Sequence, residues 1–128
     1  SGDRPKIWAM ICYITTKAAW DAAQGGGMFR SPEFDSFGFI HCSTPEQAML
    51  VANTFFAGQS GLVMLVVDPA RLNSPVRWEP PHSTGRLPDF TPGAVFPHVY
   101  GPINLDSVVR TVDLVPGEHG TFRLPLPV

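Results

Sequence analysis

Residues 38–47, which read GFIHCSTPEQ, pass directly from a short strand candidate into the start of a helix. Thr44 suits the N-cap position, Pro45 suits the first helical position, and Gln47 completes a capping box. A strand over residues 38–42 and a helix after it are therefore predicted. The residues that recur at helical spacing and form its core-facing stripe are Ala48, Val51, Ala52, Phe55 and Phe56.

The flanking sequence predicts a fold with more strands than helices. Residues 7–14 predict a strand, and Thr15 or Thr16 can cap a short helix over residues 17–24 that ends at three glycines. The apolar run 62–67 is too short for a helix and predicts a central strand. Further strands are predicted over residues 76–79, 95–100, 108–114 and 122–124, the last at an edge. We therefore expect an α+β fold, a compact β-rich core with two short helices in the N-terminal half.

Length and composition favour one domain, which we take as residues 3–128 because Ser1 and Gly2 look like the remnant of a cleaved tag. The chain has 128 residues and a mass of 13.9 kDa, which leaves little room for a second core. Leu, Ile, Val and Phe make up about 27% of it, enough apolar surface to fold. The 14 prolines and 12 glycines predict irregular loops. Residues 80–93 form the longest, and a loop of that length is usually functional or mobile.

Charge, apolar runs and cysteine spacing argue against nucleic-acid, membrane and metal partners. The net charge is −2 and the basic residues are scattered, so we expect no non-specific binding to nucleic acid. No apolar run approaches the roughly 18 residues that cross a bilayer, so we expect no membrane partner. Cys12 and Cys42 show no metal-ligand spacing, which favours reduced thiols in a cytoplasmic protein. A single bridge between them remains an alternative.

Two segments place polar side chains where a packed strand would not need them: residues 38–44 (GFIHCST) and 96–102 (FPHVYGP). Alternation along a strand puts Phe39 and His41 on one face, and likewise His98 and Tyr100. If those faces meet, a cluster of two imidazoles and a phenol forms. The alternative is that each histidine is half-buried and bonded to a loop carbonyl.

The predicted helix start also suggests a place for an anion. His41 precedes it by a few residues, and the free N–H groups and positive dipole end of a helix favour phosphate. Ser43 and Thr44 lie at this start and are candidate ligand-binding residues. The alternative is that both serve only as caps.

Three further side chains have a functional and a structural interpretation. Glu79 shares a strand face with Arg77 and can reach a ligand, or it is a surface carboxylate paired with that arginine. Tyr13 ends the first strand and suits either the core or a cleft. Cys42 lies near a helix N-terminus, but alternation points it away from His41, so we do not expect a nucleophile. A zinc site is not expected either, because His41, His82, His98 and Cys42 show no recognised ligand spacing.

These segments resemble a bacterial family of unknown function, the domain-of-unknown-function family nine-fifty-two. The resemblance runs from about residue 11 to residue 125 and depends on the order and spacing of several motifs. They are GFIHCST at 38–44, Gln47, ANxFFxG at 52–58, Leu62 with Leu65 and Asp68, Trp78-Glu79, and FPHxYGP at 96–102.

The family is similar to the ADP-ribosyltransferase fold, which implies a nucleotide site of NAD type. The resemblance implies that His41 bonds ribose hydroxyls or phosphate, and that Glu79 stabilises the positive charge at the ribose carbon. It also implies that Tyr13 and Tyr100 stack on or bond the base, while His98 positions a further polar group. No tightly bound cofactor and no metal are expected, and NAD enters as a candidate substrate.

The first strand departs from the family pattern. Family members usually have Ile-Tyr-His-Ile-Thr, whereas residues 11–15 read ICYIT, so Tyr13 takes the position of the histidine. A tyrosine stacks and donates a hydrogen bond but does not become a cation. This departure favours an alternative class, a non-catalytic module that binds a small molecule or nucleotide in the same place.

Overall fold

Strand β4 (Leu62–Val67) is the centre of the fold in the computed structural model, which describes residues 9–80 and 93–123. All six β4 residues are buried. The strand pairs antiparallel with β1 (Ile11–Thr16) on one side and β8 (Val108–Leu114) on the other. A continuous apolar run suits a strand that is covered on both faces. The prediction of a central strand over residues 62–67 is confirmed.

Two smaller antiparallel sheets and three α-helices complete the regular structure of the described residues, apart from two 3₁₀ turns. One small sheet pairs β2 with β7, and the other has the order β3-β6-β5. Strands therefore dominate an α+β fold, as predicted. The remaining elements are α1 Lys17–Ala23, β2 Met28–Phe29, α2 Pro32–Phe37, β3 Ile40–His41, α3 Pro45–Phe55, β5 Val76–Glu79, β6 Phe96–Val99, β7 Ile103–Asn104, η2 Leu105–Ser107 and η3 Glu118–Gly120.

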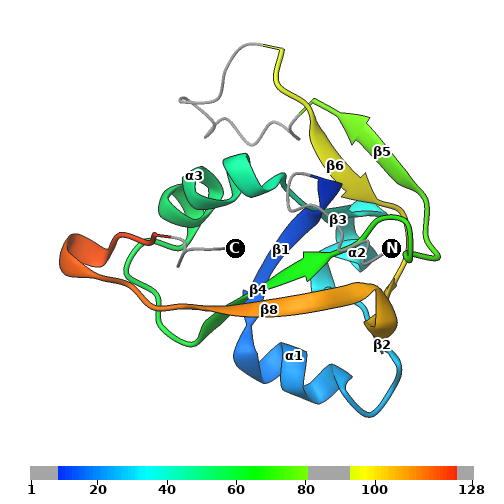
Figure 1. Ribbon diagram of the computed structural model, residues 1–128, viewed down its shortest axis with the longest axis horizontal. Coiled ribbons are helices and arrows are strands. Elements are labelled where there is room, and N and C mark those ends of the chain that lie inside the picture. The colour runs from blue at the N-terminus through cyan, green and yellow to red at the C-terminus, as the bar shows by residue number, and fades with distance from the viewer. Residues whose placement is uncertain (1–8, 81–92, 124–128) are drawn as a thin grey trace, which may run out of the picture.

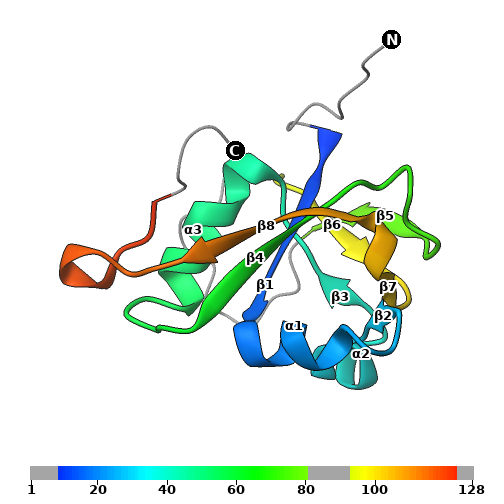
Figure 2. The same ribbon diagram turned by 60° about the horizontal axis from the view of Figure 1, so that its bottom comes forward.

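Alternation along the central sheet produces an apolar cluster on each of its faces. The first cluster joins Met64 and Val66 of β4 to Ala48 and Ala52 of α3. The second cluster lies on the other face, where α1 and the two small sheets cover it (Figures 1 and 2). Its buried members are Ile11, Phe29, Ile40, Cys42, Val63, Leu65, Val67, Val99 and Ile103. The β3-β6-β5 sheet is therefore anchored to the centre of the fold by one of its faces.

The helix signals are confirmed in detail, but the expected number of helices is wrong. Thr16 caps α1 by accepting a hydrogen bond from the Ala19 N–H at 3.0 Å, and Thr44 and Gln47 form the predicted capping box of α3. The additional helix, α2, begins with a proline after Ser31 and ends at Gly38, whose φ of 80° is left-handed. At 6 residues, α2 is too short to show an apolar period.

The structure corrects two smaller expectations and adds two short strands. Phe55 was expected in the core-facing stripe of α3, but it is 46% exposed because α3 ends there. Of the edge strand expected over residues 122–124, residues 122 and 123 form no strand, and residue 124 lies outside the described residues. Instead, the Asn53 side chain bonds both backbone groups of Phe122, whose ring is buried in the first cluster. Strands β2 and β7 were not predicted, since two residues carry no period. Of the long loop, residues 81–92 lie outside the described residues.

Candidate functional site

The β3-β6-β5 sheet carries most of the candidate residues on one face. His41 lies directly opposite His98 in the pairing of β3 with β6, and Arg77 of β5 lies opposite His98 on the other side. Cross-strand partners share a face, and alternation adds the residues two positions along. We call this the polar face. Its members are Phe39, His41, Arg77, Glu79, His98 and Tyr100.

A single carboxylate oxygen holds the polar face together. Glu79 Oε1 accepts a hydrogen bond of 2.6 Å from the Tyr100 hydroxyl and lies 2.8 Å from Nδ1 of His98. The His98 side chain is 3% exposed, whereas that of Glu79 is 34% exposed. The imidazole is thus fixed beneath a carboxylate that solvent reaches.

Hydrogen bonding keeps this carboxylate ionised. The hydrogen bonds from Tyr100 and then His98 hold the pKa of Glu79 below its ordinary value of 4.5, and the charge of Arg77 adds to the effect. The same carboxylate raises the pKa of Tyr100, because it accepts from the neutral phenol. An ionised carboxylate only accepts hydrogen bonds, so His98 carries a hydrogen on Nδ1.

Aromatic rings cover the histidine pair. The Phe39 ring stacks on His98 with centroids 4.4 Å apart, and the ring of His41 is 4.6 Å from Phe39 and 5.3 Å from His98. Phe37 meets His41 edge-on at 5.1 Å and is 44% exposed. Imidazole and phenyl faces therefore lie together at the end of α2. The two histidine-bearing faces meet, which is the condition under which the sequence predicts a cluster of two imidazoles and a phenol.

Arg77 is a member of this face that sequence reasoning did not assign to the site. Its guanidinium carbon lies 4.9 Å from the centroid of the Tyr100 ring. The interpretation in which Glu79 pairs with Arg77 is wrong. The hydrogen bonds to the Glu79 carboxylate come from Tyr100 and His98 instead. The alternation of residues 77 and 79 signals a shared face, but only the folded structure, which pairs Arg77 with His98 across the strands, shows that the Tyr100 ring lies beneath the arginine.

Ser43 and Thr44 have structural roles in the residues that the structure describes. The backbone N–H and C=O of Ser43 both bond to Cys12, which joins β1 to the segment after β3. Thr44 Oγ1 accepts from the Gln47 N–H at 3.2 Å, and Gln47 Oε1 accepts from the Thr44 N–H at 2.9 Å. Their predicted role in ligand binding stays a prediction.

Tyr13 occupies a different place from the other candidates. Its ring packs 5.5 Å from the ring of Phe29 and against the second apolar cluster. That cluster lies on the side of β3 and β6 that carries Ile40 and Val99, not His41 and His98. Of the two interpretations of Tyr13, its position matches the core.

The two cysteines, the search for a metal site and the search for a membrane span complete the description. Both thiols are free and buried, and burial raises the pKa of Cys12 to about 12. Across residues 9–80 and 93–123, no three His, Cys, Asp or Glu side chains are placed to share a metal ion, and His82 lies outside these residues. Within the same residues, no helix has the length and apolar character that crossing a bilayer requires.

Comparison with known proteins agrees with this architecture. The fold and the polar face define an α+β protein with a carboxylate, imidazole and phenol cluster on a small sheet. The chain belongs to the family described as "Protein of unknown function (DUF952)", which matches residues 14–111. No curated protein matches it.

Solved structures of one protein are similar to this chain. The crystal structure of protein CC0527 from Caulobacter crescentus is 37% identical, with a TM-score of 0.74, and the match covers 89% of this chain and 93% of that one. Its double mutant is 36% identical with the same TM-score and coverage. The solution NMR structure of CC0527 is 38% identical, with a TM-score of 0.70 over 88% of this chain and 90% of that one.

Proposed function

We propose that this protein binds a nucleotide of NAD type at the polar face and cleaves its N-glycosidic bond, as an ADP-ribosyltransferase does. The observation that carries the proposal is the ionised, solvent-accessible carboxylate of Glu79, fixed by Tyr100 and His98 on the same face as His41. The family's resemblance to the ADP-ribosyltransferase fold supplies the reaction type. Because fold alone does not establish function, the residues of the site must carry the argument.

Glu79 supplies the electrostatic part of the reaction. When the bond between the ribose carbon and nicotinamide breaks, the electron pair leaves with nicotinamide as a neutral base and positive charge develops on the sugar. A fixed carboxylate stabilises that charge until water attacks the ribose carbon and loses a proton, which gives ADP-ribose. Within residues 9–80 and 93–123, the hydrogen bonds to Glu79 go to Oε1, and Oε2 receives none. A carboxylate held by one oxygen presents the other to a ligand without losing its orientation.

The neighbouring side chains supply binding. In this proposal His41 bonds a ribose hydroxyl or phosphate, and the exposed ring of Phe37 offers a surface on which a base stacks. His98 is a positioning residue, because its Nδ1 hydrogen bond fixes the orientation of Glu79. Tyr100 has the same role through its hydroxyl.

Nicotinamide release tests the proposal. The protein is incubated with NAD, and nicotinamide is measured by chromatography for the wild type, His41→Ala and Glu79→Gln. Glutamine keeps an acceptor oxygen for Tyr100 but removes the charge, so release should fall by about 10²–10³-fold. Binding of ADP-ribose should change only a few-fold. Glu118→Gln is the matched control, since Glu118 is an exposed carboxylate beyond β8, and it should leave release unchanged.

The outcomes separate the possibilities. Release that is absent from wild type, or that is equal in wild type, His41→Ala and Glu79→Gln, would overturn the catalytic proposal. Failure to bind NAD and ADP-ribose at all would overturn the site itself.

A second function, a non-catalytic module for a small anionic or nucleotide ligand at the same face, is favoured by one observation. Tyr13, at the position of the family's first-strand histidine, packs against Phe29 in the second cluster. A ligand that binds only the native state raises the melting temperature. A rise with NAD but no release of nicotinamide would support the module.

A further inference from the structure

Arg77 is held on the polar face by a ring rather than by an acid. Its side chain is exposed, and its guanidinium lies 4.9 Å from the centroid of the Tyr100 ring. A guanidinium over an aromatic face is a cation–π contact, which orients the group without using its N–H donors. Among the residues that the structure describes, Arg77 forms no ion pair and no hydrogen bond from its side chain.

Two other arginines show the usual arrangement. Arg30 pairs with Asp35 at 2.6 Å, and Arg71 lies 3.6 Å from Asp68. A protein carboxylate lies in direct contact with each of these guanidiniums, whereas Glu79 acts on Arg77 only through its charge. Arg77 keeps all five of its N–H donors in the planar fork that matches a phosphate.

The ring beneath Arg77 ties it to the proposed reacting centre. The Tyr100 hydroxyl donates to Glu79 Oε1 at 2.6 Å, so the ring cannot swing away from Glu79 without breaking that hydrogen bond. The Tyr100 ring therefore joins the cation above it to the carboxylate on the same face. A ligand that meets both must carry an anionic group close to a group that develops positive charge. A ribose 5′-phosphate with a cationic base at C1′ has this pattern.

The start of α3 is the other predicted anion-binding position, and protein groups already form hydrogen bonds with backbone N–H groups there. At the start of α3, the Thr44 N–H donates to Gln47 Oε1 and the Gln47 N–H donates to Thr44 Oγ1. Arg77 is thus better suited than this helix end to take the phosphate.

We infer that Arg77 binds the phosphate of the ligand and makes the polar face a site for nucleotides in preference to nucleosides. The inference rests on the function proposed above and names the part of the ligand that determines specificity. Guanidinium and phosphate form bidentate, charge-assisted hydrogen bonds.

Isothermal titration calorimetry with two ligands that differ only by one phosphate tests the inference. Nicotinamide riboside and nicotinamide mononucleotide are titrated into wild type, Arg77→Leu and Arg77→Lys. Wild type should bind the mononucleotide at least about tenfold more tightly. Arg77→Leu should reduce that ratio to about one with little change for the riboside, and Arg77→Lys should give an intermediate ratio, because lysine keeps the charge but lacks the fork.

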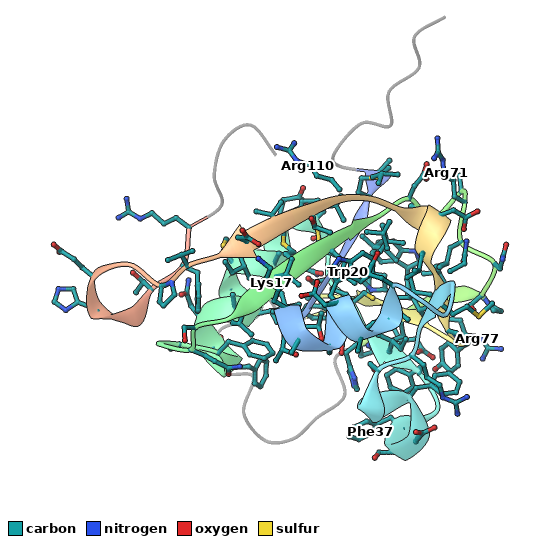
Figure 3. The ribbon with its side chains drawn as sticks, turned by 90° about the horizontal axis from the view of Figure 1, so that it is seen from below. Lys17, Trp20, Phe37, Arg71, Arg77 and Arg110 are labelled. Carbon is teal, nitrogen blue, oxygen red and sulfur yellow. The ribbon has the colours of Figure 1, made fainter. Side chains whose placement is uncertain are left out.

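Arg110→Leu is the matched control. Arg110 is an exposed arginine of β8 and lies well away from Arg77 (Figure 3). The same loss of charge there should leave the ratio unchanged. Far-UV circular dichroism and the urea midpoint report whether each variant folds, and Arg77→Lys keeps the test valid if Arg77→Leu does not fold.

The failures of the two proposals are distinguishable. Equal affinity of wild type for both ligands, or a preference that survives in Arg77→Leu, would overturn the inference while leaving the proposed function in place. An equal loss in Arg110→Leu would show a general charge effect and would also overturn it. Binding of neither ligand would overturn both proposals.

Discussion

Glu79 shows how one side chain depends on residues far away in the sequence. Of its two hydrogen-bonding partners, His98 lies on the neighbouring strand β6 and Tyr100 lies just beyond the end of that strand. Local sequence predicted only that Glu79 and Arg77 share a face. The partner of the carboxylate was decided by the register of β5 on β6, in which Arg77 lies opposite His98.

The first test at this scale changes Tyr100 to phenylalanine. The hydrogen bond from Tyr100 is the largest cause of the lowered pKa of Glu79, so its removal in Tyr100→Phe should raise that pKa toward its ordinary value. The shift is measured by following the Glu79 carboxyl carbon by NMR as the pH is changed. Tyr13→Phe makes the same chemical change in the second cluster and should leave the titration as in wild type. An unchanged titration in Tyr100→Phe would contradict the assigned hydrogen bond.

At the scale of elements, the start of α3 is fixed by its own sequence. Thr44 and Gln47 satisfy each other's backbone N–H groups, and both lie within one turn. The capping box was therefore predictable from residues 44–47 alone. The same holds for Thr16 at the start of α1.

Thr44→Ala should lower the free energy of unfolding by about 1 kcal/mol, because the Gln47 N–H loses its side-chain acceptor and keeps only the Thr44 carbonyl. Urea denaturation measures the change. Thr44→Ser, which keeps an acceptor oxygen, should restore most of it. Thr54→Ala is the control: Thr54 is an exposed residue inside α3, where alanine is as good or better in a helix. Equal destabilisation at both positions would argue against the cap.

Strand β8 shows what local pattern misses. A strict period of two would place Val108 on the same face as Val112, but the register shifts between Val66 and Val67 of β4. Val108 therefore packs against the second cluster, whereas Val112 belongs to the first. A bulge depends on the partner strand, which the sequence of β8 does not contain.

At the scale of the whole molecule, the ionisation of Glu79 couples the site to stability. Because its pKa is lower in the folded chain than the ordinary value of 4.5, the folded state binds fewer protons than the unfolded state between the two values. The stability that this carboxylate contributes is therefore present above pH 4.5 and is lost as the pH falls through the folded-state pKa.

Urea unfolding at pH 7 and pH 3 tests this coupling. Wild type should exceed Glu79→Gln in stability by more at pH 7 than at pH 3. In a Tyr100→Phe background the same comparison should change less with pH, because the main hydrogen bond to the carboxylate is absent. A difference that is independent of pH would show that Glu79 contributes by packing alone.

The sequence by itself determined the elements whose signals are local: the central strand, the two caps and the alternation that puts His98 with Tyr100, and Arg77 with Glu79, on shared strand faces. Periods and caps involve residues only a few positions apart, so they can be read along the chain. The tertiary structure alone decided which strands pair, and hence that Glu79 meets Tyr100, that Arg77 covers its ring and that Tyr13 joins the core. Strand pairing is stabilised by the burial of a shared apolar face against segments that are distant in the sequence. The free energy of that burial depends on the whole folded chain.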